Sequence, residues 1–328
     1  MAARAAALGA SVTELPSDRL KLDFPDDPKQ AYAQAKATLA IVTASPSRRR
    51  LQPIPPSADW RIDLAEGCPA HCGYCYLAGS LKGPPIVRAY ANLPQILAEI
   101  PAHLGEGTIT SRSKARAHEG TTFEASCYTD PLGIEHITGS LAATIEHFGA
   151  LDAPAGLRFT TKFAAVEPLL GLAHNGRTRM RASVNAPNLM RFEGGAHALD
   201  DRLVALGRMA RAGYPVGLTI APIMPAGEWR AGYGALIGAA AVELGDVADL
   251  DLTVELITHR FTPGSKDVLT GWYPGSDLEM DEEARAKKRT KFGSTKYVYT
   301  AEVMREMRAF FEAAIPERLP TARILYWT

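Results

Sequence analysis

The chain has few cysteines and no excess of charge of either sign. Four cysteines occur in 328 residues, and 36 lysines and arginines balance 36 aspartates and glutamates. A balanced total excludes a protein that is basic over its whole surface, although it allows local basic clusters. The small number of cysteines excludes a scaffold held together by disulfides, and a chain of this length buries a core large enough to fold without them.

Long apolar runs are also missing, since no stretch approaches the ~20 apolar residues that a membrane-spanning helix requires. The N-terminal sequence MAARAAALGASVTELPSDRL lacks a proper apolar region and a convincing cleavage site. We therefore expect residues 1–26 to form a flexible arm, not a signal peptide. A cytoplasmic, reducing location follows, in which the thiols are metal ligands, reactive groups or core residues.

After the arm, segments with strand character alternate with helical segments. The expected strands are 59–65, 121–127, 156–163, 178–185, 215–222 and 250–259. The expected helices between them are 93–104, 133–149, 166–174, 199–213 and 228–245. Six such units predict an α/β fold with a parallel sheet and right-handed crossovers, a partial (β/α)6 barrel over about 59–260.

The expected barrel has an extension at each end. An N-terminal helix is predicted over 27–42, with Asp27 as its N-cap and Pro28 in its first turn. The C-terminal extension, 261–328, is expected to contain a basic hairpin (285–299), a helix (301–315) and a last strand (322–327). We expect residues 27–328 to form a single domain.

Three of the four cysteines lie on one short loop, EGCPAHCGYCYLAG, as Cys68, Cys72 and Cys75. This loop follows the first expected strand, and Cys127 ends the second. Because the chemistry of such folds gathers at the carboxyl ends of the strands, all four thiols are expected at the same mouth of the barrel.

The residues alone leave three interpretations of the clustered thiols. They fit three ligands of a [4Fe-4S] cluster whose fourth iron stays open. They also fit a Cys₃His zinc site completed by His71, although zinc ligands usually come as two separated pairs. Buried structural cysteines are the third interpretation, but they do not explain the clustering.

The spacing Cys68-x3-Cys72-x2-Cys75, with Tyr74 before the last cysteine, is similar to the cluster loop of the radical S-adenosylmethionine superfamily. Further blocks resemble one family within it, spore photoproduct lyase. They are GCPAHCGYCYLAG, VRAYANL, FEASCYTDPLGIEH, TTKFAAVEPLL, AHNGRTRMRASVNA, AGYPVGLTIAPI, ELITHRFT, KYVY and ILYWT, in the same order. The resemblance runs from about Asp27 to Thr328.

The resemblance implies a lyase that repairs DNA. In this family a [4Fe-4S] cluster cleaves S-adenosylmethionine to a 5′-deoxyadenosyl radical, which opens spore photoproduct, 5-thyminyl-5,6-dihydrothymine, to two thymines. Cys127 is then the hydrogen-atom donor, and Tyr74 and Tyr76 return the radical toward the cofactor. Without the resemblance, Cys127 reads as a small buried residue and both tyrosines as packing aromatics.

For S-adenosylmethionine the family pattern points to Thr129, Lys162 and Ser183. An ammonium at Lys162 suits a methionyl carboxylate, and a hydroxyl at Ser183 suits a ribose or carboxylate contact. The alternative for all three is an ordinary polar residue at a strand end. Thr129 stands where the family has a serine, so this contact departs from the pattern.

The resemblance also implies contacts to DNA, for which the segment 284–297 is the candidate. Its expected phosphate contacts are Lys288, Arg289, Lys291 and Lys296, and Phe292 is expected at the hairpin tip as a wedge that helps to extrude the lesion. The family has an arginine and a tyrosine at the positions of Lys291 and Phe292. A solvated charged face is the alternative.

The expected partners are DNA with a thymine dimer lesion and an electron donor such as flavodoxin or ferredoxin, with the chain a monomer and no membrane contact. One alternative is a spore photoproduct lyase-like radical enzyme that acts on a different DNA lesion or another substrate. Another is a non-catalytic DNA-binding protein with a structural zinc.

Overall fold

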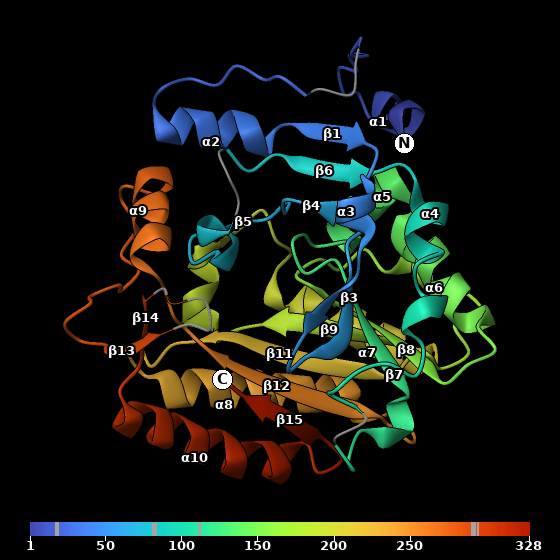
Figure 1. The fold of residues 1–328 in the computed structure, drawn as a ribbon. Helices are drawn as coiled ribbons and strands as arrows, with labels where there is room; N and C mark the ends of the chain where they lie inside the picture. Colours follow the sequence, from blue (N-terminus) through green and yellow to red (C-terminus); the bar gives the residue numbers. More distant parts are fainter. Residues whose placement is uncertain (17–19, 81–83, 111–112, 290–292, 294) are drawn as a thin grey trace.

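The computed structural model describes residues 1–16, 20–80, 84–110, 113–289, 293 and 295–328. Its centre is a curled sheet in the order β15-β12-β11-β9-β8-β7-β3-β2 (Figure 1). The bounds of these strands are β2 (Gln52–Ile54), β3 (Ala58–Ile62), β7 (Thr121–Ala125), β8 (Ala155–Thr161), β9 (Thr178–Val184), β11 (Val216–Ile223), β12 (Leu252–Thr258) and β15 (Arg323–Trp327).

All neighbouring strands in this sheet are parallel except β2 and β3. The six strands expected from the sequence, β3, β7, β8, β9, β11 and β12, are all present and lie side by side in chain order. This arrangement confirms the predicted partial barrel. The expected last strand is β15, which extends the same sheet beyond β12.

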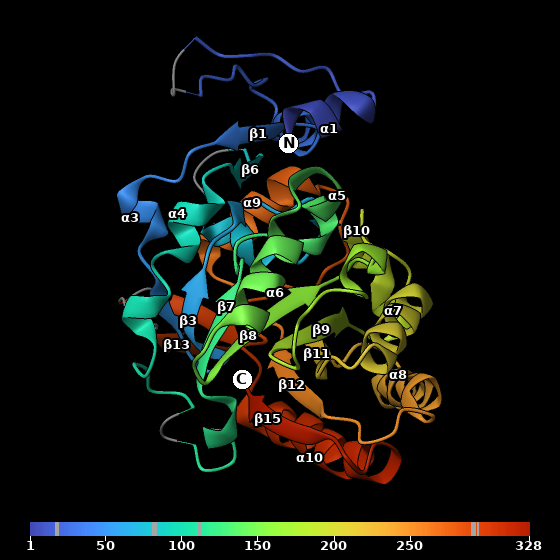
Figure 2. The ribbon, with the colours of Figure 1, turned by 90° about the vertical axis from the view of Figure 1, so that its right-hand side faces the viewer.

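Helices cover the outer face of the sheet (Figure 2). The larger ones are α6 (Ser140–Ala150), α7 (Leu199–Arg211), α8 (Trp229–Leu244) and α10 (Ala301–Arg318), preceded along the chain by α4 (Leu93–Leu97) and α5 (Glu135–Thr138). In α7 the aspartates Asp200 and Asp201 occupy the first turn and Arg208 and Arg211 the last, which complements the helix dipole. The main core lies between these helices and the strands and includes Phe123, Phe148, Phe159, Leu206 and Leu218.

The predicted N-terminal helix is too long. The structure has α2 (Pro28–Lys36), capped by the Asp27 side chain, which accepts a hydrogen bond from the Gln30 amide at 2.8 Å. The following residues form β1 (Leu39–Val42), which pairs with β6 (Val87–Tyr90); β4 (Ala65–Glu66) pairs with β6 on its other side. This small sheet was not predicted, because β1 is only four residues long and its pairing partner is remote in the sequence.

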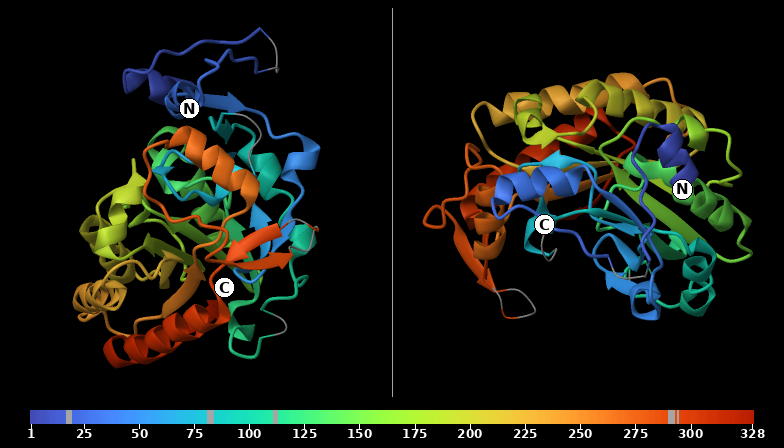
Figure 3. Two further views of the ribbon diagram at one scale, coloured as in Figure 1. Left: turned by 90° about the vertical axis from the view of Figure 1, so that its left-hand side faces the viewer. Right: turned by 90° about the horizontal axis from the view of Figure 1, so that it is seen from above.

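Further differences from the sequence prediction concern short elements. The helix expected over 93–104 is reduced to α4 and the 3₁₀ turn η2 (Pro101–His103). The helix expected over 166–174 is reduced to the 3₁₀ turn η5 (Glu167–Leu169). A helix not predicted, α9 (Pro263–Trp272), begins with a capping box in which Thr262 and Ser265 bond each other's backbone amides. It lies against α2 and the 3₁₀ turn η1 (Tyr76–Gly79), and Figure 3 shows it beside α2.

The remaining short elements include α1 (Ala2–Ala7), which lies in the expected N-terminal arm and packs against α5. The others are α3 (Pro46–Arg49), η2 (Pro101–His103), η3 (Ala117–Glu119), η4 (Leu132–Ile134) and η6 (Pro187–Phe192), with β5 (His71–Cys72) pairing β10 (Glu193–Gly194) and β13 (Ala286–Arg289) pairing β14 (Thr295–Val298). Of the helices in the described ranges, none is long and apolar enough to cross a membrane. The flexibility of the arm and the single-domain boundary at residue 27 stay predictions.

Candidate active site

The loop with three cysteines follows β4, and backbone contacts with other segments fix its conformation. Gly67 has φ +78°, and a Cβ there would lie 2.0 Å from the Ile86 carbonyl oxygen, so only glycine fits at this turn. Cys72 lies in β5, whose strand pairing joins it to Glu193 of β10. The next amide, Gly73, donates to the Phe192 carbonyl at 2.7 Å. The loop is therefore a defined part of the fold.

Two helices from opposite ends of the sequence hold the outer side of this loop. From α2, the Lys36 ammonium donates to the carbonyls of Cys68 and Ala70, both at 2.6 Å. From the end of α9, the Tyr273 hydroxyl donates to the His71 carbonyl at 2.8 Å. Tyr32 of α2 joins the helices, because its ring stacks on Trp272 and its hydroxyl bonds that of Tyr273.

All four cysteines carry free thiols. Burial raises the pKa of the Cys68, Cys72 and Cys75 thiols, that of Cys72 to about 12. Charge repulsion from Cys72 and Cys75 adds to the rise at Cys68, and repulsion from Cys75 adds to the rise at Cys72. The Lys36 ammonium offsets part of the rise in pKa at Cys68 and Cys75. A ligand that accepts three thiolates would release this repulsion.

The donor set fits a cluster better than a single zinc ion. Three thiolates on one short loop suit a cubane, because each thiolate binds its own iron. The His71 ring, the fourth ligand of the zinc interpretation, packs edge-on against Tyr32 with 6.0 Å between ring centroids.

Cys127 lies directly beyond β7, next to the end of β3. The turn that carries it is fixed by Ser126, which has φ +57°. The Ser126 amide donates to the Ile62 carbonyl, and the Ser126 hydroxyl accepts a hydrogen bond from the Leu64 amide. Burial, together with the carboxylates of Glu124 and Asp63, holds the pKa of the Cys127 thiol well above its usual value. The group therefore keeps its hydrogen at neutral pH, as a hydrogen-atom donor requires.

The two candidate relay tyrosines have different surroundings. Tyr76 is 67% exposed, and its hydroxyl donates to the Cys127 carbonyl, so it adjoins the proposed donor. Tyr74 is buried, and its hydroxyl donates to Glu193 and accepts from the Lys162 ammonium at 3.2 Å. The structure thus brings Tyr76, and not Tyr74, into contact with Cys127.

Lys162, at the end of β8, belongs to a buried ionic network that the sequence did not reveal. Its ammonium lies 2.7 Å from a Glu193 oxygen, and Arg202 of α7 pairs with the other oxygen of the same carboxylate. Burial opposes ionisation of Glu193, but the charges of Lys162 and Arg202 outweigh it and lower the carboxyl pKa. No motif pointed to Glu193 or Arg202, because strand pairing and a helix from the next unit bring them there.

The other two residues expected at S-adenosylmethionine lie at the same edge of the sheet. Thr129 is buried beyond β7, and its hydroxyl has no hydrogen-bond partner among the described residues. Ser183 is buried near the end of β9. Asp130, between them in the fold, accepts from the Thr161 hydroxyl and the Lys162 amide, both at 2.7 Å, and so fixes the backbone that presents Lys162.

The expected basic hairpin is present. Lys288 of β13 stands opposite Lys296 of β14, and Arg289 stands opposite Thr295. Lys288 and Arg289 are exposed. Burial and the charges of Arg260 and Lys288 lower the pKa of the Lys296 ammonium, which shows that cations are concentrated here. The expected tip residues Lys291 and Phe292 lie outside the described residues.

The sheet is a partial barrel, with three cysteines after its first strand and polar residues at the ends of the next three strands. This arrangement defines a radical S-adenosylmethionine enzyme fold. The comparisons narrow this class. The model of the spore photoproduct lyase family matches residues 4–328. The chain belongs to the spore photoproduct lyase family, as its sequence motifs predicted.

Two curated relatives named spore photoproduct lyase illustrate the similarity. The protein of Bacillus subtilis is 40% identical over 300 residues, covering 91% of this chain and 84% of the relative. The protein of a Geobacillus species is 39% identical over 325 residues, covering 98% of this chain and 91% of the relative.

Solved structures agree along almost the whole chain. Spore photoproduct lyase complexed with dinucleoside spore photoproduct matches with a TM-score of 0.89 and 37% identity, covering 98% of this chain and 92% of that one. A double mutant of spore photoproduct lyase with bound AdoMet and the same dinucleoside matches with a TM-score of 0.89 and 35% identity, covering 99% and 93%.

Proposed function

We propose that this chain is a lyase that reverses spore photoproduct in DNA to two thymines. The observation that carries the proposal is a free thiol, Cys127, set apart from the cysteine loop that suits a [4Fe-4S] cluster but at the mouth of the same barrel. The chain's membership of the spore photoproduct lyase family and its similarity to a structure that holds the dinucleoside lesion support the same substrate.

Cys68, Cys72 and Cys75 would hold the cluster, and Thr129, Lys162 and Ser183 would contact S-adenosylmethionine. When bound, these groups supply a carbon-centred adenosyl radical able to abstract a hydrogen atom. The Lys162 ammonium suits the methionyl carboxylate as a partner. If it left Glu193 to bind that carboxylate, Glu193 would still be paired with Arg202. The unpaired Thr129 hydroxyl is free to bond the same ligand.

Cys127 would complete the reaction as the donor of one hydrogen atom. Its S–H bond is weak, so the thiol gives its hydrogen to the thymine methylene radical left when the bridging carbon–carbon bond breaks. The product is then an ordinary thymine methyl group, and the sulfur carries the unpaired electron. Tyr76 is in place to pass a hydrogen atom onward, because its hydroxyl already contacts the Cys127 backbone.

The DNA contacts are proposed at the β13–β14 hairpin. Lys288, Arg289 and Lys296 would neutralise phosphates of the DNA backbone. A local cluster of cations is needed for this, because the chain as a whole has no net positive charge. Lys291 and Phe292 are proposed at the tip, with Phe292 as the wedge beside the extruded lesion. We further propose a monomer in the cytoplasm, where chromosomal DNA and a small electron-transfer protein such as flavodoxin or ferredoxin are at hand.

An anaerobic assay tests this function. Reconstituted protein, S-adenosylmethionine and a reductant are mixed with synthetic dinucleoside spore photoproduct, and thymidylyl-thymidine is followed by chromatography. We expect repair by the wild type and by the neighbouring variant Tyr128→Phe, but little or misdirected product from Cys127→Ala. Cleavage of S-adenosylmethionine with an intact lesion would show that this scaffold acts on another substrate.

A further inference from the structure

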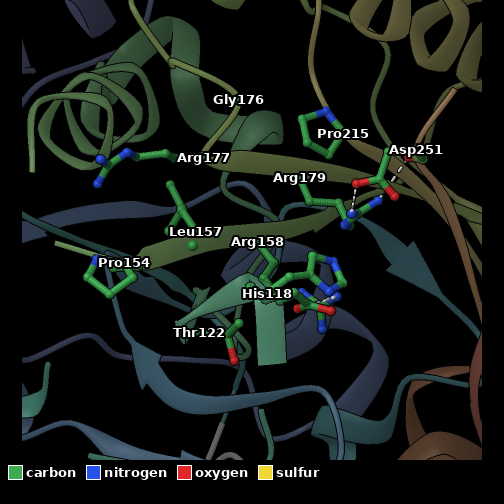
Figure 4. A pocket seen from close by; sticks show the side chains of 13 residues that line it. His118, Thr122, Pro154, Leu157, Arg158, Gly176, Arg177, Arg179, Pro215 and Asp251 are labelled. Carbon is green, nitrogen blue, oxygen red and sulfur yellow. Dashed lines mark hydrogen bonds and ion pairs between the residues drawn. The ribbon is translucent and has the colours of Figure 1, made fainter. Parts of the chain in front are cut away.

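A pocket of about 290 Å³ opens at the end of the barrel opposite the cysteines (Figure 4). Its wall includes Pro154, Gly176 and Pro215, the residues that lead into β8, β9 and β11. Two proposed active-site residues, Lys162 and Ser183, stand at the opposite, carboxyl ends of β8 and β9. We propose that this pocket binds a small phosphate-bearing anion, at a site separate from the active site.

The charges on the pocket wall favour an anion. Three arginines line it, Arg158, Arg177 and Arg179, against two carboxylates, Glu119 and Asp251. Both carboxylates are also engaged by arginines from outside the wall. Arg116 pairs with Glu119 at 3.0 Å, and Arg323 shares Asp251 with Arg179. The carboxylates are therefore more than neutralised before any ligand enters.

Arg177 is the arginine on the pocket wall whose positive charge has no carboxylate beside it among the residues that the structure describes. In the described part of the chain its guanidinium donates a hydrogen bond to the Ala153 carbonyl and has no carboxylate partner. In Figure 4 its side chain extends along the Pro154 side of the pocket, across from the Arg179–Asp251 pair. Its head group is thus available to a ligand without breaking an ion pair.

Arg158 is a buried arginine on the pocket wall with one guanidinium nitrogen that, among the described residues, lacks a hydrogen bond. Its side chain is 2% exposed, one guanidinium nitrogen donates to the Ser57 carbonyl, and the other, Nη2, has no hydrogen-bond partner in the described ranges. Its two carboxylate partners are distant, since Nη2 lies 3.7 Å from a Glu119 oxygen and Nη1 lies 3.6 Å from an oxygen of the buried Glu255. Burial and the neighbouring Arg181 and Arg116 lower its pKa to about 10, although the carboxylates of Glu255 and Glu119 oppose this shift.

A buried guanidinium N–H without a hydrogen bond carries a desolvation cost that an anionic oxygen would reduce. Phosphate suits such a site, because its oxygens accept hydrogen bonds from several planar guanidinium groups at once. His118, which lies beside Arg158 in Figure 4, adds a further ring nitrogen. The pocket volume admits inorganic phosphate or a small phosphomonoester, and not a folded polymer.

Isothermal titration of the full chain with inorganic phosphate tests the site. We expect saturable binding to the wild type and affinity about tenfold weaker in Arg177→Gln, which removes a cation without breaking an ion pair. Arg211→Gln is the matched control, because Arg211 is an arginine of α7 that pairs with Glu243 and Asp246. Arg158→Met is a second variant, checked for folding by circular dichroism.

Three outcomes overturn the proposal. The first is no phosphate binding by the wild type in the millimolar range. The second is equal affinity in Arg177→Gln and Arg211→Gln. The third is displacement of phosphate by saturating S-adenosylmethionine, which would place the anion at the active site. Titration with adenosine monophosphate and with a short oligonucleotide distinguishes a small phosphomonoester from a DNA backbone phosphate as the source.

Discussion

Lys36 donates hydrogen bonds from one ammonium group to the carbonyls of Cys68 and Ala70, both at 2.6 Å. A single side chain of α2 thus fixes two peptide groups of the cysteine loop and places a positive charge beside the thiols. That charge already offsets part of the rise in the pKa of Cys68 and Cys75. Its effect on a bound cluster follows from the same electrostatics.

Replacing Lys36 with methionine is expected to make the cluster harder to reduce. The reduced cluster carries one more negative charge, which a nearby cation stabilises. At a fixed potential we expect the ratio of reduced to oxidised cluster to fall about tenfold, which corresponds to ~59 mV for a one-electron couple. A redox titration followed by electron paramagnetic resonance measures this ratio.

Lys36→Arg retains the charge and should stay near the wild-type potential. Lys29→Met, on the exposed side of the same helix, is the matched control. An unchanged potential in Lys36→Met, with the cluster retained, would show that the ammonium only supports the loop backbone.

Tyr76→Phe and Tyr74→Phe are expected to have different effects. Tyr76 contacts the Cys127 carbonyl from an exposed position, so its loss should leave stability nearly unchanged and slow the return of the radical after repair. Tyr74→Phe removes a hydrogen bond to the charged Glu193 and should cost about 1.5–3 kcal/mol of unfolding free energy. Urea unfolding and the turnover rate measure the two effects, and equal destabilisation by both variants would contradict this assignment.

The Cys127 thiol should resist alkylation. Its pKa is raised well above the usual value, so the reactive thiolate fraction near neutral pH is smaller than in an unfolded chain. Iodoacetamide labelling read by mass spectrometry should therefore modify Cys127 more slowly in the folded protein than in the same protein in urea. Labelling of the folded protein as fast as in urea would mean that the burial of the thiol is not maintained.

Glu193→Ala should strongly destabilise the protein, because it leaves the buried Arg202 and the partly buried Lys162 without their shared carboxylate. Loss of one partner of a buried ion pair typically costs about 3–5 kcal/mol. The folded-state pKa of Glu193 is lowered, so its contribution is fully present above the unfolded pKa, near 4.5, and is lost as the pH falls through the folded value. Urea unfolding at neutral and acidic pH should show the gap between wild type and variant narrowing as acid is added.

The sequence was sufficient for the sheet and for the cysteine loop. Each of the six barrel strands is mostly buried, and three cysteines within eight positions have few interpretations. It was not sufficient for the supports of the loop. Lys36 and Tyr273 lie 32 and 202 residues from the carbonyls they hold, at Cys68 and His71, and nothing in their local sequence marks them.

The same limit explains why Tyr74 and Tyr76 could not be distinguished. They are two residues apart and of one type. The 3₁₀ turn η1 begins at Tyr76 and directs the Tyr76 hydroxyl to the Cys127 carbonyl, whereas the Tyr74 hydroxyl bonds Glu193. A predicted helix over 27–42 failed for a related reason, since β1 exists only through its pairing with β6.

The contact between Tyr32 and Tyr273 joins positions 241 residues apart, and the cysteine loop is held between the two helices that it links. Contacts of such long separation form late, because the intervening chain must be ordered before its ends meet. Iron and sulfide would therefore be delivered to a molecule whose barrel is already built. A mutation that loosens α9 would be expected to appear as a defect in maturation, with normal synthesis and normal thiols but little cluster.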